Sequence, residues 1–333
     1  MLFVCSVPNP LQHLTLSDEQ KISYIHTDRK VLKKEYGTMC RMKTTAITCS
    51  DINDLKIYAQ HGADEVIFAP VNCSFSALQE IREEDLKEAI DTAHQLGMKV
   101  SLLMNRLFGN SEILAAEKKM DTYMQYGADG IIFADPGLAY HACKTGCMDR
   151  MIYQPDTLVT SSYDASFWMN QGLKSVTVSP LITKDEIVAM TQQTEGLSLV
   201  VHGRLMMSVS KRRLLSAFKD ETGLSFHPEH NRSLYLVEEK RDGKMPVYEN
   251  AYACMIYSDF VQESFDEMPS FQKASRFVID GAWLPLQESV DALDIYKGMI
   301  EGKDMQREIE AYRSTYGKEG RLSDGYYGLK TIR

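Results

Sequence analysis

A histidine and a short basic run follow an apolar stretch in the second half of the chain. Residues 197–201 predict a buried strand that ends at His202, and Gly203 behind it allows close approach of another backbone or a ligand. A histidine at such a position can act as a general base, a hydrogen-bond donor or a metal ligand. Lys211 and Arg212 follow, and these cations can bind a phosphate or a carboxylate. A histidine bonded to loop backbone beside a solvated charge run is an equally open interpretation.

Polar side chains also follow other predicted strands. Asn105, Asp135 and Asp280 each come directly after an apolar run, and Gln154 and Asp156 follow another. Enzymes with parallel barrels build their sites from such residues at strand ends. Asp-Pro-Gly and Asp-Gly are also common turn sequences, so each residue alone indicates little. Together they predict one pocket.

Two spacings resemble metal sites only superficially. Cys143 and Cys147 have helical spacing but no matching second pair, and Pro228 prevents a helical display of His227 and His230. No Gly-x-Ser-x-Gly motif or Ser-His-Asp order is visible. We therefore predict no metal site.

The elements that position these residues repeat along the chain. Gly-Ala-Asp-x-x-Ile-Phe-Ala occurs at Gly62–Ala69 and again at Gly127–Ala134, each time as a helix-ending glycine followed by a buried strand. Strands are predicted at residues 44–48, 65–68, 100–104, 130–133, 151–153, 175–178, 197–201 and 276–279, mostly alternating with amphipathic helices. This count predicts a (β/α)8 TIM-like barrel. A doubly wound open sheet is the alternative, but no glycine-rich phosphate loop follows the first strand.

Three segments depart from the alternation. Residues 1–41 are weakly patterned and are predicted to be a loosely attached extension of a barrel over 42–301, or alternatively a helix covering the barrel's base. Residues of about 219–257 predict a β-hairpin insertion before the last strand, with Asp242-Gly243 at its turn. Residues 302–333 are expected to hold the end of the closing helix and an irregular tail.

Composition narrows the function classes. The chain has 333 residues, 44% of them hydrophobic and 25% charged, as in ordinary globular proteins. The net charge of −9 disfavours a broadly basic nucleic-acid binder. Seven scattered cysteines do not suggest a disulfide framework, which favours the cytoplasm. No apolar run approaches the ~20 residues that span a bilayer, so no membrane partner is expected.

Several segments, taken in order, resemble the collagenase-like peptidase family (peptidase family U32), in its shorter Gram-positive type. These are Gly62–Pro70, Leu86–Val100 with Asn105, Ala134–Gly137, Val201–Gly203 with Ser210–Arg212, and Ile279–Gly281. The resemblance covers about Lys43 to Glu301. The family is named for collagen degradation. Several members act instead in wobble-uridine hydroxylation of tRNA, or in quinone hydroxylation as paired subunits with iron–sulfur clusters.

The resemblance implies a role in tRNA wobble-uridine hydroxylation, with a paralogous subunit and tRNA as partners. It implies a pocket whose catalytic candidates are His202, Asp135, Asn105 and Asp280, and whose substrate-binding candidates are Lys211, Arg212, Gln154 and Arg204. The two basic residues of the Ser-Lys-Arg segment are expected to hold a phosphate or a prephenate-like carboxylate. Proteolysis and a non-catalytic partner subunit are the alternatives, and catalysis by the chain alone stays open.

The chain also departs from the family pattern. Relatives with clusters carry cysteines where Met206 and Arg213 stand, so no iron–sulfur cluster is expected in this subunit. Ser179-Pro180-Leu181 replaces Arg-Glu-Leu, which removes a charged pair from the barrel mouth. Pro155-Asp156 replaces a polar pair after the fifth strand.

Overall fold

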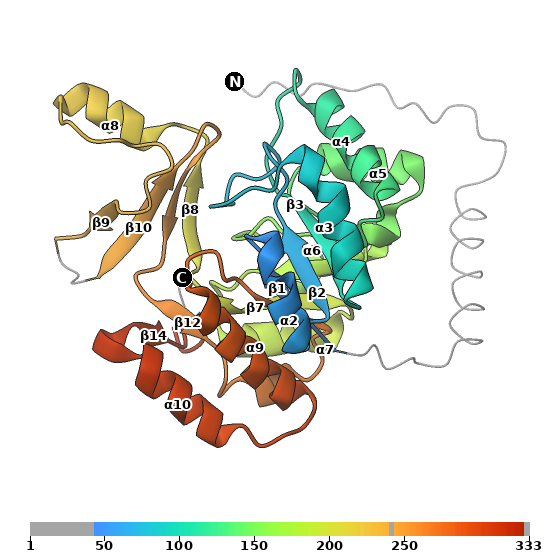
Figure 1. Ribbon diagram of the computed structural model, residues 1–333, viewed down its shortest axis with the longest axis vertical. Helices are drawn as coiled ribbons and strands as arrows, with labels where there is room; N and C mark the ends of the chain where they lie inside the picture. The colour runs from blue at the N-terminus through green and yellow to red at the C-terminus, as the bar shows by residue number, and fades with distance from the viewer. Residues whose placement is uncertain (1–42, 240–242, 330–333) are drawn as a thin grey trace, which may run out of the picture. The chain divides into compact units, whose positions relative to one another are not determined.

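Eight parallel strands form a closed ring in the computed structural model, which describes residues 43–239 and 243–329 (Figure 1). They are β1 (Thr44–Thr48), β2 (Glu65–Phe68), β3 (Lys99–Met104), β4 (Gly130–Phe133), β5 (Met151–Tyr153), β6 (Ser175–Val178), β7 (Leu197–Gly203) and β13 (Arg276–Ile279). The ring closes because β13 pairs with both β7 and β1. The predicted (β/α)8 barrel is confirmed. The extension expected at residues 1–41 lies outside the described residues.

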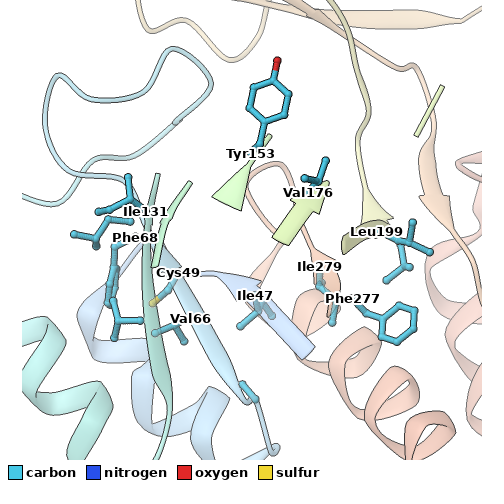
Figure 2. Packing of buried hydrophobic residues seen from close by; sticks show 14 of the residues in the cluster. Ile47, Cys49, Val66, Phe68, Ile131, Tyr153, Val176, Leu199, Phe277 and Ile279 are labelled. Carbon is cyan, nitrogen blue, oxygen red and sulfur yellow. The ribbon is translucent and has the colours of Figure 1, made fainter. Parts of the chain in front are cut away.

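Helices surround the barrel and cover the outward side chains of its strands. They are α2 (Leu55–Gln60), α3 (Glu83–Gln95), α4 (Ile113–Gln125), α5 (Pro136–Thr145), α6 (Ser162–Asn170), α7 (Lys184–Gln193) and α9 (Leu286–Ile300), with short 3-10 turns at Ile52–Asp54, Met148–Arg150, Met268–Phe271 and Lys318–Gly320. Figure 2 labels members of this outer core, among them Val66 and Phe68 on β2 and Phe277 and Ile279 on β13. Burial of this apolar surface is the main stabilising contribution to the barrel.

The barrel interior is layered from base to mouth. At the base, Arg276 makes a buried ion pair with Glu65, with 2.7 Å between Nη2 and Oε1. An apolar layer of Ala46, Ile67, Ile132, Ile152 and Val278 lies above it. The next layer of side chains, toward the carboxyl ends of the strands, lines a cavity. Because the carboxyl ends of all eight strands meet at one end of the barrel, we expect the polar side chains that follow the strands to lie around this one opening.

The chain between β7 and β13 forms a second, antiparallel sheet. Its strands are β8 (Met206–Ser210), β9 (Tyr235–Val237), β10 (Lys244–Glu249) and β11 (Cys254–Tyr257), in the order β8-β11-β10-β9, and α8 (Leu214–Thr222) follows β8. β8 follows β7 after only two residues, so the sheet starts earlier than the 219–257 expected for the insertion. A small apolar cluster, which includes Phe75, Met206 and Tyr257, joins this sheet to the loop after β2.

The C-terminal segment packs back against the barrel. Helix α10 (Gln306–Tyr316) buries Ile309 and Tyr312, and β14 (Leu322–Ser323) pairs with β12 (Val261–Glu263), which itself pairs with the end of β7. The segment after residue 302, expected to hold the end of the closing helix and an irregular tail, contains a separate helix and a short strand. Within the described ranges, no helix is both long and apolar enough to cross a membrane.

Candidate functional site

A cavity of about 90 Å³ lies at the carboxyl ends of the barrel strands. We call it the mouth cavity. Its floor is the apolar layer of the barrel. Its opposite wall includes Met206 and Tyr257 from the inserted sheet and Leu205 from the link between β7 and β8. The polar side chains that line it are Thr48, Ser50, Ser76, Gln79, Gln154, Asp156, Thr177, Arg204 and Asp280. Pockets with such a lining, apolar walls with a few polar groups, are typical of small-molecule sites.

Asp156 is a buried carboxylic acid of the mouth cavity with a strongly raised pKa. Burial raises its pKa to about 7, and the negative charge of Asp280 raises it further, against hydrogen bonds from Gln154 and Asn105. Those bonds are long, at 3.3 Å from Gln154 Nε2 and 3.4 Å from Asn105 Nδ2, so they stabilise the ionised form only weakly. Asp156 has a φ of 58°, a conformation that aspartate and asparagine tolerate better than most residues. The sequence placed this residue in the predicted pocket, as a carboxylate directly after Pro155 at a strand end, but did not single it out as catalytic or substrate-binding.

Asp280, Gln154 and Arg204 also line the mouth cavity, as their positions after strands predicted. Burial raises the pKa of Asp280, while the backbone N–H of Ala282 stabilises the ionised form. Arg204 donates from Nη1 to the carbonyl of Ser258 at 2.6 Å. The charged side chains among the described lining residues are thus two carboxyls and one guanidinium.

Asn105 is fully buried beside the cavity and acts through its neighbours. Its Oδ1 accepts a bond from Ser74 Oγ at 2.7 Å, and its Nδ2 donates to Ser76 Oγ at 3.0 Å. Together with the long contact to Asp156, these bonds fix the amide in one orientation. Asn105 therefore lies next to Asp156 behind the cavity wall rather than lining the cavity itself.

His202 lies outside the mouth cavity, in the outer core. The β7–β13 register passes from Val200 opposite Val278 to His202 opposite Ile279, so β7 carries one extra residue there. Such a bulge changes the alternation of side chains, and His202 takes the outward side. Its Nε2 lies 2.8 Å from the hydroxyl of Tyr312. The expected position of His202 at the barrel mouth is therefore not the one observed.

Gly203, directly after the bulge, lets the end of β7 pack closely against the backbone of Asp280. It has a φ of 124°, and a Cβ there would lie 2.4 Å from the carbonyl oxygen of Asp280. The backbone N–H of Asp280 in turn donates to the carbonyl of His202 at 2.8 Å. The end of β7 thus holds Asp280 in place through its backbone.

Asp135 caps a helix instead of facing the cavity. Its Oδ1 accepts from the N–H of Gly137 at 2.7 Å, which caps α5, and its Oδ2 accepts from the N–H of Phe108 at 2.7 Å. Both oxygens are therefore engaged in holding the α5 start against the loop after β3.

The basic residues after β8 are separated from the mouth cavity. Lys211 lines a second depression of about 660 Å³ between the segment after β5 and the inserted sheet, and its Nζ donates to the carbonyl of Leu107 at 3.1 Å. We call this depression the lateral groove; it is lined by Phe75, Arg106, Leu107, Glu112, Ala134, Tyr153, Pro155, Thr157, Leu158, Met207, Ser208, Val209, Lys211, Ala251, Tyr252 and Ala253. Arg212 is exposed and lines neither of these two sites.

The cluster ligands of some relatives have no counterpart among the described residues. No group of three or more His, Cys, Asp or Glu side chains in this part of the chain could hold a metal ion. Met206 contributes a thioether to the cavity wall, and Arg213 ion-pairs with Glu229. The thiol of Cys49 lines the cavity, but burial raises its pKa to about 12. The described residues therefore do not fit an iron–sulfur cluster.

Comparisons with known proteins relate this arrangement to others. A family model described as Peptidase family U32 matches residues 50–241. The tRNA hydroxylation protein P2 of Bacillus subtilis (strain 168) is 23% identical over 261 residues, which cover 77% of this chain and 84% of that protein. The tRNA hydroxylation protein P of Haemophilus influenzae is 28% identical over 170 residues, which cover 50% of this chain but 37% of that protein. Among solved structures, the U32 peptidase Mk0906 aligns with a TM-score of 0.47 and 15% identity, covering 74% of this chain and 95% of that one.

Proposed function

The chain belongs to peptidase family U32, and on that premise we propose that it takes part in hydroxylation of the wobble uridine of tRNA in the cytoplasm. The observation that carries this proposal is the similarity to tRNA hydroxylation protein P2, which extends over most of both chains. The mouth cavity supports it, because convergent polar groups around acids with raised pKa values are typical of a reactive site.

The lateral groove suits the nucleotides that flank the reacting one. Tyr252 offers an aromatic ring and Lys211 offers a cation, whereas Tyr153 and Arg106 are largely buried in the groove wall. The guanidinium of Arg106 lies 3.7 Å from the ring centroid of Tyr252 and forms an ion pair with Glu112, so its charge is already compensated and Lys211 is the cation available to a phosphate. A local basic and aromatic surface is compatible with the overall acidic charge, since phosphate contacts are short-range at cellular salt.

We propose further that a paralogous subunit works with this chain. Hydroxylation oxidises the base and needs a redox partner, and the described residues offer no set of thiolates to hold one. In this scheme the present chain supplies the pocket and RNA contacts, while a cysteine-bearing relative supplies the redox group. An affinity pull-down tests this: recovery of no related chain contradicts it.

Proteolysis finds less support in the geometry. None of the described residues lining the mouth cavity is a histidine, so no Ser or Cys there has a neighbouring imidazole base. The raised pKa keeps the Cys49 thiol protonated. Cleavage of gelatin by the purified protein would reverse this preference.

Nucleoside mass spectrometry of tRNA from a deletion strain tests the proposed function. We expect wobble hydroxyuridine to disappear and to return with the wild-type gene or with Glu308→Gln, which changes an exposed carboxylate on α10. Asp280→Asn is expected to restore at most a tenth of it, since general acid–base groups typically contribute ~100-fold or more. An unchanged nucleoside profile in the deletion strain would refute the proposal.

A further inference from the structure

The charge of the mouth cavity limits what it can bind. Its described charged residues are Asp156, Asp280 and Arg204, and the guanidinium already donates to a backbone carbonyl. Ser179 and Pro180, at the end of β6, add no charge to this rim. A ligand with two carboxylates would face two acids with one partly engaged cation. The cavity is therefore better suited to an uncharged polar molecule.

The cavity also has the lining that a flat ring requires. Ile67, Ile132 and Val278 form an apolar floor, while Asp156 and Gln154 lie next to each other among the polar lining residues. Apolar walls with a few oriented polar groups are how proteins hold a nucleobase that has left its stack.

Asp156 has the hydrogen-bonding capacity to recognise such a ring. A protonated carboxyl presents one donor, its O–H, beside one acceptor, its carbonyl oxygen. The imide edge of uracil presents the matching pair, N3–H and O4. An ionised carboxylate can accept a hydrogen bond from N3–H, but its second oxygen has no hydrogen to donate to O4 and is repelled by it.

We propose that Asp156, as a neutral carboxylic acid, recognises the imide edge of a uracil ring held in the mouth cavity. This rests on the proposed function and deepens it, because it names the residue that selects the base. The same assignment directs anionic groups away from this cavity, toward the lateral groove where Lys211 lies.

The protonation state of Asp156 depends on its surroundings in the cavity. Asp280 disfavours a second negative charge, and Tyr257 on β11 lies close enough to interact with both acids. Cys49 after β1 and Arg204 after β7 are the other titratable groups in the lining. With a pKa of about 7, most Asp156 carboxyls are neutral at about pH 6 and most are ionised at about pH 8.

Ligand-observed NMR with uridine, 3-methyluridine and malonate tests this assignment on the full chain. The methyl group removes the N3–H donor, and malonate probes for a dicarboxylate site. We expect uridine to bind at least about tenfold more tightly than 3-methyluridine at about pH 6, because a good bidentate contact discriminates by about that factor or more. That preference should shrink at about pH 8, and malonate should not displace uridine.

Two substitutions at one position separate recognition from folding. Asp156→Asn keeps a donor beside an acceptor and tolerates positive φ, so it should retain the preference for uridine and lose its pH dependence. Asp156→Ala should lose the preference, and Glu308→Gln should behave as wild type. Absent or equal binding of the two nucleosides, displacement of uridine by malonate, or a preference that survives in Asp156→Ala would each overturn the inference. Loss of hydroxyuridine on gene deletion is measured separately, so the proposed function can stand when this assignment fails.

Discussion

Replacing His202 by glutamine should change how the stability of the protein depends on pH. His202 is fully buried, and burial followed by the charge of Arg321 lowers its pKa from 6.5 to about 3. The folded state therefore favours the neutral imidazole. The contribution of the neutral His202 to the free energy of unfolding is complete above about pH 6.5, and it is lost as the pH falls toward 3. At about pH 5 the loss amounts to about 2 kcal/mol, since each pH unit below the unfolded pKa costs about 1.4 kcal/mol.

Urea unfolding at about pH 7 and about pH 5 measures this effect. The wild-type free energy of unfolding should fall between the two conditions by about 2 kcal/mol more than that of His202→Gln. Glutamine keeps a polar group in reach of Tyr312 without a titrating ring. His227→Gln, at an exposed position, is the matched control and should keep the wild-type dependence. Equal pH dependence in wild type and His202→Gln would refute the assignment of a buried, neutral histidine.

Two further substitutions test the barrel itself. Glu65→Gln removes the negative partner of Arg276 and leaves a buried guanidinium without charge compensation, so urea unfolding should show a loss of about 3–5 kcal/mol. Glu301→Gln, at an exposed ion pair, should leave the free energy of unfolding nearly unchanged, and a similar cost for both would contradict the buried pair. Gly203→Ala adds a Cβ against the Asp280 carbonyl at positive φ and should lower the unfolding free energy by about 1–3 kcal/mol, whereas an unchanged thermal midpoint would show that the two segments are not in contact.

The barrel strands were predictable because local signals agree with the tertiary structure. Gly62 and Gly127 end helices at positive φ, and the apolar runs behind them are buried on both faces in parallel strands. The C-terminal helix was missed although Ile309, Tyr312 and Tyr316 have helical spacing. Their polar neighbours gave that segment low average hydrophobicity, so its apolar stripe was easy to overlook.

The site was predictable to the extent that strand alternation continues to the strand ends. Gln154 and Asp280 follow regular strands and reach the mouth cavity as expected. His202 follows a strand with one extra residue, and nothing local in the sequence indicates that bulge. Asp135 satisfies two backbone donors, a role that its Asp-Pro-Gly context also permits. The end of a strand thus predicts the position of a residue, whereas local contacts and bulges determine the orientation of its side chain.

The closure between the first and last barrel strands has a consequence during synthesis on the ribosome. β1 takes one of its two neighbours from β13, and the ion pair that locks the base joins residues 211 positions apart. The ion pair of Glu65 therefore cannot form until Arg276 on β13 has been translated. The barrel cannot close before β13 has been synthesised, so the nascent protein has an unpaired edge on β1 until then.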